Sequence, residues 1–297
     1  MRVIISGASG LIGSALWAEL HKDGHDVVKL VRRTPSGDGE IQWDPAKGVL
    51  AADALDGADA VVHLAGAGIG DHRWTTEYKA EIRDSRIRST TLLAETIAAA
   101  AQRPPVLLSG SAIGIYGASD GRELDETSPI GSGFLADVCR QWEEAAAPAA
   151  AAGTRVAFLR TGIVLTPKGG ALKKMLPLFK LFAGGRFGNG KQWQSWVTLA
   201  DEVGAIVHLL AADVHGPVNL TAPNPITNAG FAKLLGKALG RPSFLPVPSF
   251  GPKLLLGGEL ADALLLSGQN VLPKVLQQSG YHFQHPRLDE AFASMFA

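Results

Sequence analysis

The first thirty-three residues show the most regular pattern of hydrophobic and polar positions in the chain. The apolar run within residues 2–6 predicts a buried strand, and the glycine-rich stretch 7–13 follows it directly. Residues 14–22 have the spacing of an amphipathic helix, and the apolar run 27–31 predicts a second strand. The order strand, glycine turn, helix, strand is the opening unit of a dinucleotide-binding fold.

The same alternation continues to about residue 165. Apolar runs predict further strands at 40–43, 60–66, 106–109 and 156–159. Helical periodicity predicts long helices over 77–101 and 134–152. Strands that alternate with helices are typical of a parallel sheet covered on both faces. We therefore expect an α/β fold with a Rossmann-like, doubly wound parallel sheet.

The pattern changes at Thr166, where glycine and proline become frequent. Residues 176–182 form an apolar, helix-like patch, 196–210 predict a strand, a turn and a helix, and 218–220 predict a sheet strand. A helix is expected over 228–239 and a proline-rich loop over 241–252. We expect a Rossmann domain over 1–166, with 196–222 returning to it. The smaller C-terminal α/β region, 167–195 and 223–297, would bind the substrate.

Composition and charge exclude several classes of protein. The 297 residues are 46% hydrophobic, with 28 basic and 28 acidic residues, so a basic nucleic-acid footprint is not expected. Cys139 is the only cysteine, which excludes an intrachain disulfide, and the eight histidines have no metal-ligand spacing. No signal sequence or membrane span is predicted, so we expect a cytoplasmic protein with no metal and no membrane partner.

The residues after the second predicted strand indicate which dinucleotide is preferred. Arg32 and Arg33 stand where an NAD site usually has a carboxylate for the ribose hydroxyls, and no acidic residue occurs from 27 to 37. A guanidinium can pair with a 2′-phosphate, which a carboxylate would repel. We therefore expect NADP(H), with Arg32 as the better candidate because Arg33 can equally be a solvated loop charge.

The chain resembles the extended short-chain dehydrogenase/reductase superfamily over its whole length. Within it, the chain is most similar to the atypical branch called the epimerase family, predicted to contain nucleoside-diphosphate-sugar epimerases. The segments that carry the resemblance are 7–13, 31–33, 41–44, 63–66, 73–79, 85–91, 111–117, 160–165, 188–197, 267–271 and 280–281. Singly most of these motifs are weak, but their order and spacing are specific.

The resemblance implies a set of NADP(H) contacts. The residues expected to hold the pyrophosphate are Gly7, Ser9, Gly10, Leu11 and Ile12. Those expected along the adenosine and ribose are Arg32, Arg33, Leu64, Ala65 and Gly66. Glu81 and Arg86 match positions that face the cofactor in relatives, although residues five apart share a helix face poorly. The residues expected near the nicotinamide are Ser109, Gly110 and Ile163, since strand ends meet there. By analogy, the superfamily also implies a homodimer through the helices 77–101 and 134–152.

The acid/base pair of the superfamily is missing. Its dehydrogenases use a serine with a Tyr-x-x-x-Lys pair, in which the lysine lowers the pKa of the tyrosine. Ser111 is in place, but Tyr116 is followed four residues later by Asp120, and the next helix starts with Phe134. Ser111 and Tyr116 are the catalytic candidates. The unranked alternatives are Asp137, Lys174, Lys191 and His72, or no chemistry at all, as in an NADP(H) sensor.

The substrate side remains open. Arg186, Lys191 and Gln192 are candidates for binding an anionic group, or solvated surface residues. Trp193, Trp196 and Phe187 can stack on a ring or pack in the core. The substrate is therefore expected to be a small molecule, either a nucleotide sugar or another carbonyl or alcohol.

Overall fold

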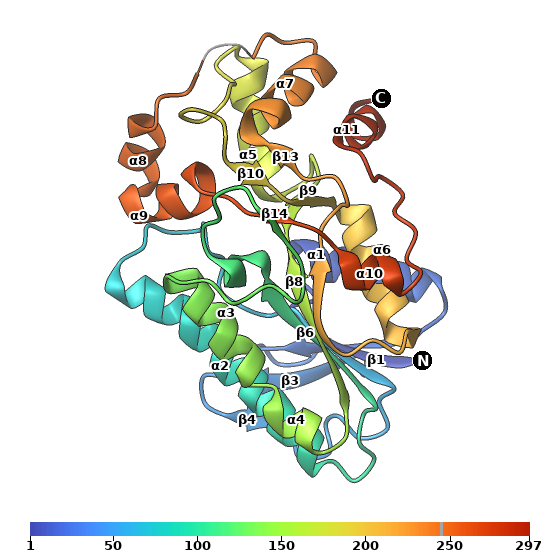
Figure 1. The fold of residues 1–297 in the computed structure, drawn as a ribbon. Helices are drawn as coiled ribbons and strands as arrows, with labels where there is room; N and C mark the ends of the chain where they lie inside the picture. The colour runs from blue at the N-terminus through green and yellow to red at the C-terminus, as the bar shows by residue number, and fades with distance from the viewer. Residues whose placement is uncertain (244–245) are drawn as a thin grey trace.

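The central sheet of the computed structural model, which describes residues 1–243 and 246–297, has eight strands. Their order is β12-β8-β6-β5-β1-β2-β3-β4, and all neighbours pair in parallel except β3 and β4. The strands are β1 (Arg2–Ser6), β2 (Asp26–Val31), β3 (Glu40–Asp44), β4 (Val49–Leu50), β5 (Ala60–His63), β6 (Val106–Ala112), β8 (Arg155–Thr161) and β12 (Gly216–Leu220). The expected doubly wound α/β fold is confirmed (Figure 1).

Helices cover both faces of this sheet (Figure 1). Helices α1 (Leu11–Lys22) and α6 (Leu199–Ala211) pack on one face with Val3 and Ile5, and α2 (Thr76–Ala99) packs on the other with Ile4. Successive strand residues point to opposite faces, so one short apolar strand supplies both hydrophobic cores. The continuous apolar runs in the sequence therefore reflect burial on two sides.

The helix expected over 134–152 is wrong as a single element. The structure has α3 (Phe134–Glu144) and α4 (Ala147–Ala151), with Pro148 in the first turn of α4. Proline has no amide hydrogen and its ring clashes with the preceding turn, so a helix cannot run through it undisturbed. Part of the loop expected over 241–252 is also helical, since α8 (Phe250–Leu256) begins there. Residues 244–245 lie outside the described chain.

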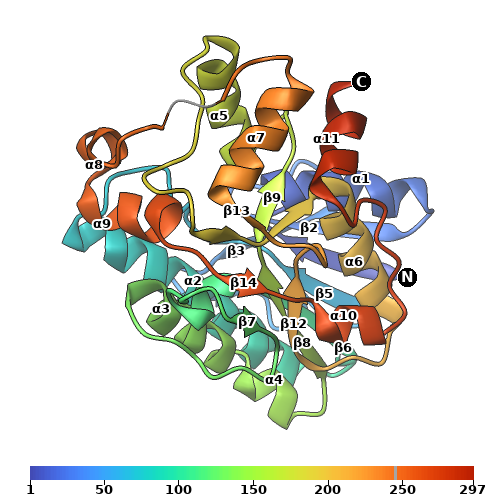
Figure 2. The same cartoon turned by 45° about the horizontal axis from the view of Figure 1, so that its top comes forward.

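A second, smaller core lies above the sheet in Figures 1 and 2. It is formed by α5 (Gly170–Lys180), α7 (Asn228–Ala238) and α11 (Leu288–Phe296), with the strand pair β9 (Ile163–Leu165) and β11 (Trp196–Thr198). Two further elements, β10 (Trp193–Gln194) and β13 (Ile226–Thr227), pair beside it. The boundary between the two parts at residue 166 stays a prediction.

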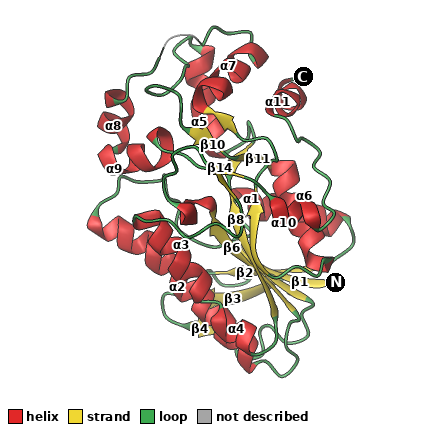
Figure 3. Cartoon of the chain, in the orientation of Figure 1, coloured by secondary structure: helices red, strands yellow, loops and turns green. Residues whose placement is uncertain are grey.

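The C-terminal segment crosses back to the central sheet. After α9 (Gly258–Ala261) and the π-helical turn η2 (Asp262–Leu266), β14 (Asn270–Val271) pairs with β7 (Glu123–Leu124), and α10 (Lys274–Gln278) follows. Figure 3 shows this chain passing between the helical upper part and the sheet. Among the helices of the described residues, none has the length and apolar character needed to cross a membrane.

Candidate functional site

The glycine turn between β1 and α1 is packed so closely that its glycines have almost no room for a side chain. Gly7 has φ +72°, and a Cβ there would lie 2.7 Å from the carbonyl carbon of Leu64. A Cβ on Gly13 would lie 2.2 Å from the Gly7 carbonyl oxygen. Gly10, which precedes α1, provides no side-chain cap. The first amides of α1 are therefore left for an anion beside the turn.

The other residues expected at this turn differ in exposure. Ser9 and Gly10 are exposed, whereas Leu11 and Ile12 are half-buried. A Cβ on Gly169, which precedes α5, would lie 2.6 Å from Cδ1 of Leu11. Leu11 thus connects the glycine turn to the C-terminal part of the chain.

The two arginines after β2 have different surroundings. Arg33 donates to both carboxylate oxygens of Glu40, at 2.7 and 2.6 Å, and this pairing lowers the pKa of Glu40 to about 2. Arg32 is exposed, and among the described residues no hydrogen bond or ion pair involves its side chain. The sequence argument missed Glu40, which the pairing of β3 with β2 brings beside the arginines. Arg33 neutralises that carboxylate and leaves Arg32 available.

Side chains of α2 hold the loop that follows β5. His63 is fully buried, with Nδ1 2.6 Å from Ser6 Oγ and Nε2 3.1 Å from Ser89 Oγ, and burial lowers its pKa to about 3. Arg86 donates to the Ala67 carbonyl at 2.9 Å and packs against Gly66. Glu81, in contrast, is exposed. The loop that contains Leu64, Ala65 and Gly66 is thus held at the carboxyl end of the sheet.

Ser111 and Tyr116 are joined by a buried polar network. Ser111 Oγ donates to Glu143 Oε1 at 2.7 Å, and Arg160 donates to both oxygens of Glu143 at 2.8 and 2.9 Å. Arg160 also donates to the Tyr116 hydroxyl at 2.9 Å, and that hydroxyl donates to Asn219 Oδ1 at 2.8 Å. Burial raises the pKa of Tyr116. Both hydroxyl protons are therefore engaged inside the protein.

Sequence reasoning did not find Glu143 as a member of this site. It lies on α3, 32 residues from Ser111, and only the packing of α3 against β6 and β8 brings the groups together. The nicotinamide-end candidates lie close by. Ser109 is fully buried, and a Cβ on Gly110 would lie 2.7 Å from the Trp142 ring, while Ile163 starts β9.

A cleft of about 390 Å³ lies between the start of α3 and the α9–η2 segment. Its walls are Trp74, Gly114, Gly117, Ala118, Ser132, Gly133, Phe134, Leu135, Ala136, Glu259, Asp262, Ala263, Ser267 and Gln269. The rings of Trp74 and Phe134 meet edge to face with centroids 5.0 Å apart. Lys79 Nζ lies 4.6 Å from the Phe134 centroid and donates to Glu259 at 2.6 Å. Phe134 and Trp74 thus form the aromatic part of the cleft wall.

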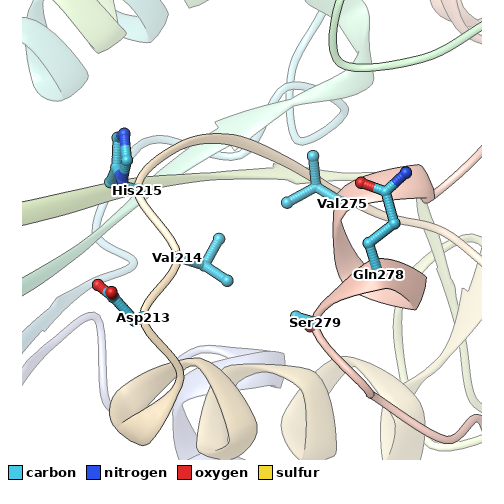
Figure 4. Close-up of a pocket in the computed structure, with 6 residues that line it drawn as sticks. All are labelled: Asp213, Val214, His215, Val275, Gln278 and Ser279. Carbon is cyan, nitrogen blue, oxygen red and sulfur yellow. The ribbon is translucent and has the colours of Figure 1, made fainter.

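A second hollow, of about 310 Å³, lies at the other end of the sheet. Figure 4 shows its lining from the loop before β12, which contributes Asp213 and His215, and from the α10 region, which contributes Val275 and Gln278. This hollow is at the amino end of β12. Dinucleotide sites of doubly wound sheets lie at the carboxyl ends of the strands, so the cleft at α3 is the better substrate site.

The remaining candidates are accounted for by packing or exposure. Trp196 is fully buried and Phe187 is buried, so both are core residues, while Gln192 donates to the Phe187 and Leu265 carbonyls. Burial raises the pKa of Cys139 to about 12. The His72 ring meets the Tyr78 ring edge to face, and Lys174 donates to the Gly70 carbonyl, whereas Asp137, Lys191 and Arg186 are exposed. No cluster of metal-binding side chains exists among the described residues.

Glu202 makes the stability of the protein depend on pH. It is fully buried in the first turn of α6, where Thr161 is its one hydrogen-bond donor among the described residues, at 2.8 Å, and burial raises its pKa to about 8. Between the ordinary pKa of glutamate, which applies in the unfolded chain, and about 8, the carboxyl is ionised in the unfolded state but neutral in the folded state. The free energy of unfolding therefore falls as pH rises through this range.

Glu202→Gln is therefore expected to remove this dependence. The wild-type protein should lose on the order of 1 kcal/mol per pH unit relative to the variant across this window. Urea unfolding of both proteins from about pH 5 to about pH 8 measures the difference. If the free energy of unfolding changes with pH in the same way for both proteins, the Glu202 carboxyl is already ionised in the folded state.

Comparisons with known proteins agree with this geometry. Residues 3–221 match the family model described as "NAD dependent epimerase/dehydratase family", and 247–295 match a domain of unknown function, DUF1731. The chain is 44% identical over 292 residues to "Epimerase family protein ML0860" of Mycobacterium leprae, covering 98% of this chain and 94% of that protein. It is 40% identical over 301 residues to the human epimerase family protein SDR39U1, covering both chains fully.

One solved structure has an especially similar fold. The crystal structure of human SDR39U1 (isoform 2) with NADPH superimposes with a TM-score of 0.89 at 36% identity, covering 99% of each chain. The family-model match and the curated relatives both span the glycine turn, the arginines after β2 and the network around Ser111.

Proposed function

Because this chain belongs to the NAD dependent epimerase/dehydratase family, we propose that it binds NADP(H) and acts as an oxidoreductase or epimerase-like enzyme on a small carbonyl or alcohol. The observation that carries the proposal is the uncapped start of α1 at the glycine turn together with the exposed Arg32. The human relative crystallised with NADPH supports the same cofactor.

The residues present fit this cofactor. Ser9, Gly10, Leu11 and Ile12 would present the first amides of α1 to the pyrophosphate, as a helix N-terminus favours an anion. Arg32 would pair with the 2′-phosphate, while Arg33 neutralises the Glu40 carboxylate by pairing with it. Leu64, Ala65 and Gly66 would line the adenosine path. The residues assigned to the nicotinamide end are Ser109, Gly110 and Ile163.

The protein's own groups would orient the substrate. The cofactor supplies a hydride when bound. Ser111 donates its proton to Glu143, so its oxygen can accept a hydrogen bond from a substrate but has no proton left to donate. We assign Ser111 and Tyr116 to the wall that positions the reacting oxygen, with Glu143 and Arg160 fixing both.

A non-catalytic NADP(H) sensor is the second candidate function. The observations that favour it are Phe134 at the first position of α3 and the engagement of the Tyr116 hydroxyl by Asn219. A sensor would bind NADPH without turning over any substrate. Its affinity for a partner protein would differ between the NADPH-bound and the NADP⁺-bound states. Turnover of any carbonyl by the NADPH-loaded protein, or of any alcohol by the NADP⁺-loaded protein, decides between the two.

The first test of the proposal is Arg32→Asp. This change removes a charge-assisted pair with the 2′-phosphate and adds a repulsion, so NADPH binding should weaken by about 2 kcal/mol or roughly thirtyfold. NADH, which has no 2′-phosphate, should bind almost as before. Fluorescence titration with NADPH, NADP, NADH and NAD measures both.

Lys47→Asp is the matched control, because it makes the same charge change in an exposed turn between β3 and β4. It should leave both affinities unchanged. An equal loss of NADPH and NADH affinity in Arg32→Asp would place the 2′-phosphate elsewhere.

A further inference from the structure

Basic and acidic residues are segregated along this chain. Residues 167–195 and 223–257, which include α5, α7 and α8, contain no aspartate or glutamate, and we call them the basic region. The basic residues of this region are Lys168, Lys173, Lys174, Lys180, Arg186, Lys191, Lys233, Lys237, Arg241 and Lys253. All 28 acidic residues lie in the rest of the chain. The formal net charge of zero therefore averages a basic part of the molecule with an acidic one.

The cations of the basic region are available to a partner. All of them are exposed, and among the described residues the only ion pair that any of them makes joins Lys253 to Asp262, at 2.8 Å. All but Arg186 and Arg241 are lysines. A lysine ammonium acts as a point charge, whereas arginine is preferred where one phosphate or carboxylate is held bidentately. The region is therefore suited to a surface that carries many negative charges.

Large apolar side chains protrude from the same region. Leu181 and Phe182 follow α5 directly, and Phe250 and Leu254 lie one turn apart on α8. Among the described residues, these four are the most exposed large apolar side chains. Figures 1 and 2 both show α8 and the upper end of α5 on the outer side of the helical upper part, away from the central sheet. Exposed apolar side chains that gather in one region mark an interaction surface.

The backbone of Phe182 indicates that this ring is not there for folding. Its φ is +61°, the only positive φ of a non-glycine residue in the described part of the chain. This conformation is unfavourable for a bulky residue, whereas glycine or asparagine adopts it at low cost. The Arg241 guanidinium lies 5.0 Å from the ring centroid, but no core covers the ring. Local strain of this kind is found mainly at functional positions.

We propose that the basic region, with its four protruding apolar side chains, binds the surface of an anionic lipid bilayer. Lysine cations are attracted to acidic headgroups, while leucine and phenylalanine enter the boundary between headgroups and acyl chains. A nucleic acid would use the cations but would leave the leucines without a partner. We expected no membrane partner because no span is predicted, but contact with the bilayer surface needs no span. The proposal does not rest on NADP(H) binding.

Sedimentation of the intact protein with vesicles tests the proposal. One kind of vesicle is phosphatidylcholine alone, and the other is equal parts of phosphatidylcholine and phosphatidylserine. The protein should sediment with the anionic vesicles only, and added salt should release it because salt screens the lysines. Phe182→Asn should weaken this binding about tenfold, and the variant should still fold because asparagine tolerates the backbone conformation. Lys180→Gln should weaken it roughly fivefold.

Val49→Asn and Lys47→Gln are the matched controls. They change an exposed apolar residue and an exposed lysine beside β4, which Figure 1 shows at the opposite end of the molecule from α5. Both should bind the anionic vesicles like the wild-type protein. NADPH titration of all four variants should give the wild-type affinity, which separates this surface from the proposed cofactor site.

Three results would overturn the membrane surface. The first is no sedimentation with anionic vesicles, and the second is unchanged sedimentation of both Phe182→Asn and Lys180→Gln. The third is binding of single-stranded DNA, or self-association measured by sedimentation velocity, that Phe182→Asn or Lys180→Gln weakens while vesicles are not bound. The basic region would then serve a nucleic acid or a second copy of the chain.

Discussion

Replacing Arg160 with Met is expected to destabilise the protein by about 3–5 kcal/mol, because it leaves the Glu143 carboxylate buried without its partner. The side chains of Arg160 and Glu143 are only 6% and 11% exposed, and two hydrogen bonds join them. The same change leaves the Tyr116 hydroxyl without its donor. Urea unfolding at about pH 7 gives the free energy of unfolding for both proteins.

Two further variants make this result specific. In Arg160→Met with Glu143→Leu, no charge is left unpaired, so the double variant should be more stable than the single one. Arg140→Met breaks the ion pair with Glu144 on the same helix, but those side chains are 43% and 59% exposed, so it should cost less than about 1 kcal/mol. Equal losses for Arg140→Met and Arg160→Met would mean that burial does not set the strength of the inner pair.

Gly13→Ala is expected to abolish NADPH binding and to reduce stability by about 1–3 kcal/mol. The added methyl would lie 2.2 Å from the Gly7 carbonyl oxygen and 2.9 Å from the Ala8 Cα. Both neighbours are backbone atoms, so α1 must shift away from β1. The amides that would face the pyrophosphate then lose their positions. NADPH titration and urea unfolding of the same preparation separate the two effects.

Gly37→Ala is the control for this change. Gly37 also follows β2 near the arginines, but a Cβ there meets no atom within 4 Å. It should bind NADPH like the wild-type protein and be equally stable. If Gly13→Ala binds NADPH normally, the turn tolerates the shift, and close packing of α1 on β1 is not needed for the cofactor.

Some tertiary features were hidden from the sequence because the partners are far apart along the chain. Glu143 meets Ser111 and Arg160 only when α3 packs on the sheet. Glu40 pairs with Arg33 only because β3 adds to the edge of β2. The break between α3 and α4 is different, since Pro148 is visible in the sequence and its effect on the helix was overlooked.

The sequence by itself determined the order of strands and helices and the glycine turn, because each depends on residues close in the chain, and it predicted Arg32 as the residue that binds the 2′-phosphate. Periodicity of apolar positions reports which face is buried, and a strand, turn and helix need only local contacts. The tertiary structure decided which polar groups are free. It paired Arg33 and left Arg32 exposed, joined Ser111 and Tyr116 through Glu143 and Arg160, and placed Phe134 and Glu259 in the lining of one cleft. Burial and hydrogen bonding depend on residues brought together from distant segments, and these set the chemistry of the site.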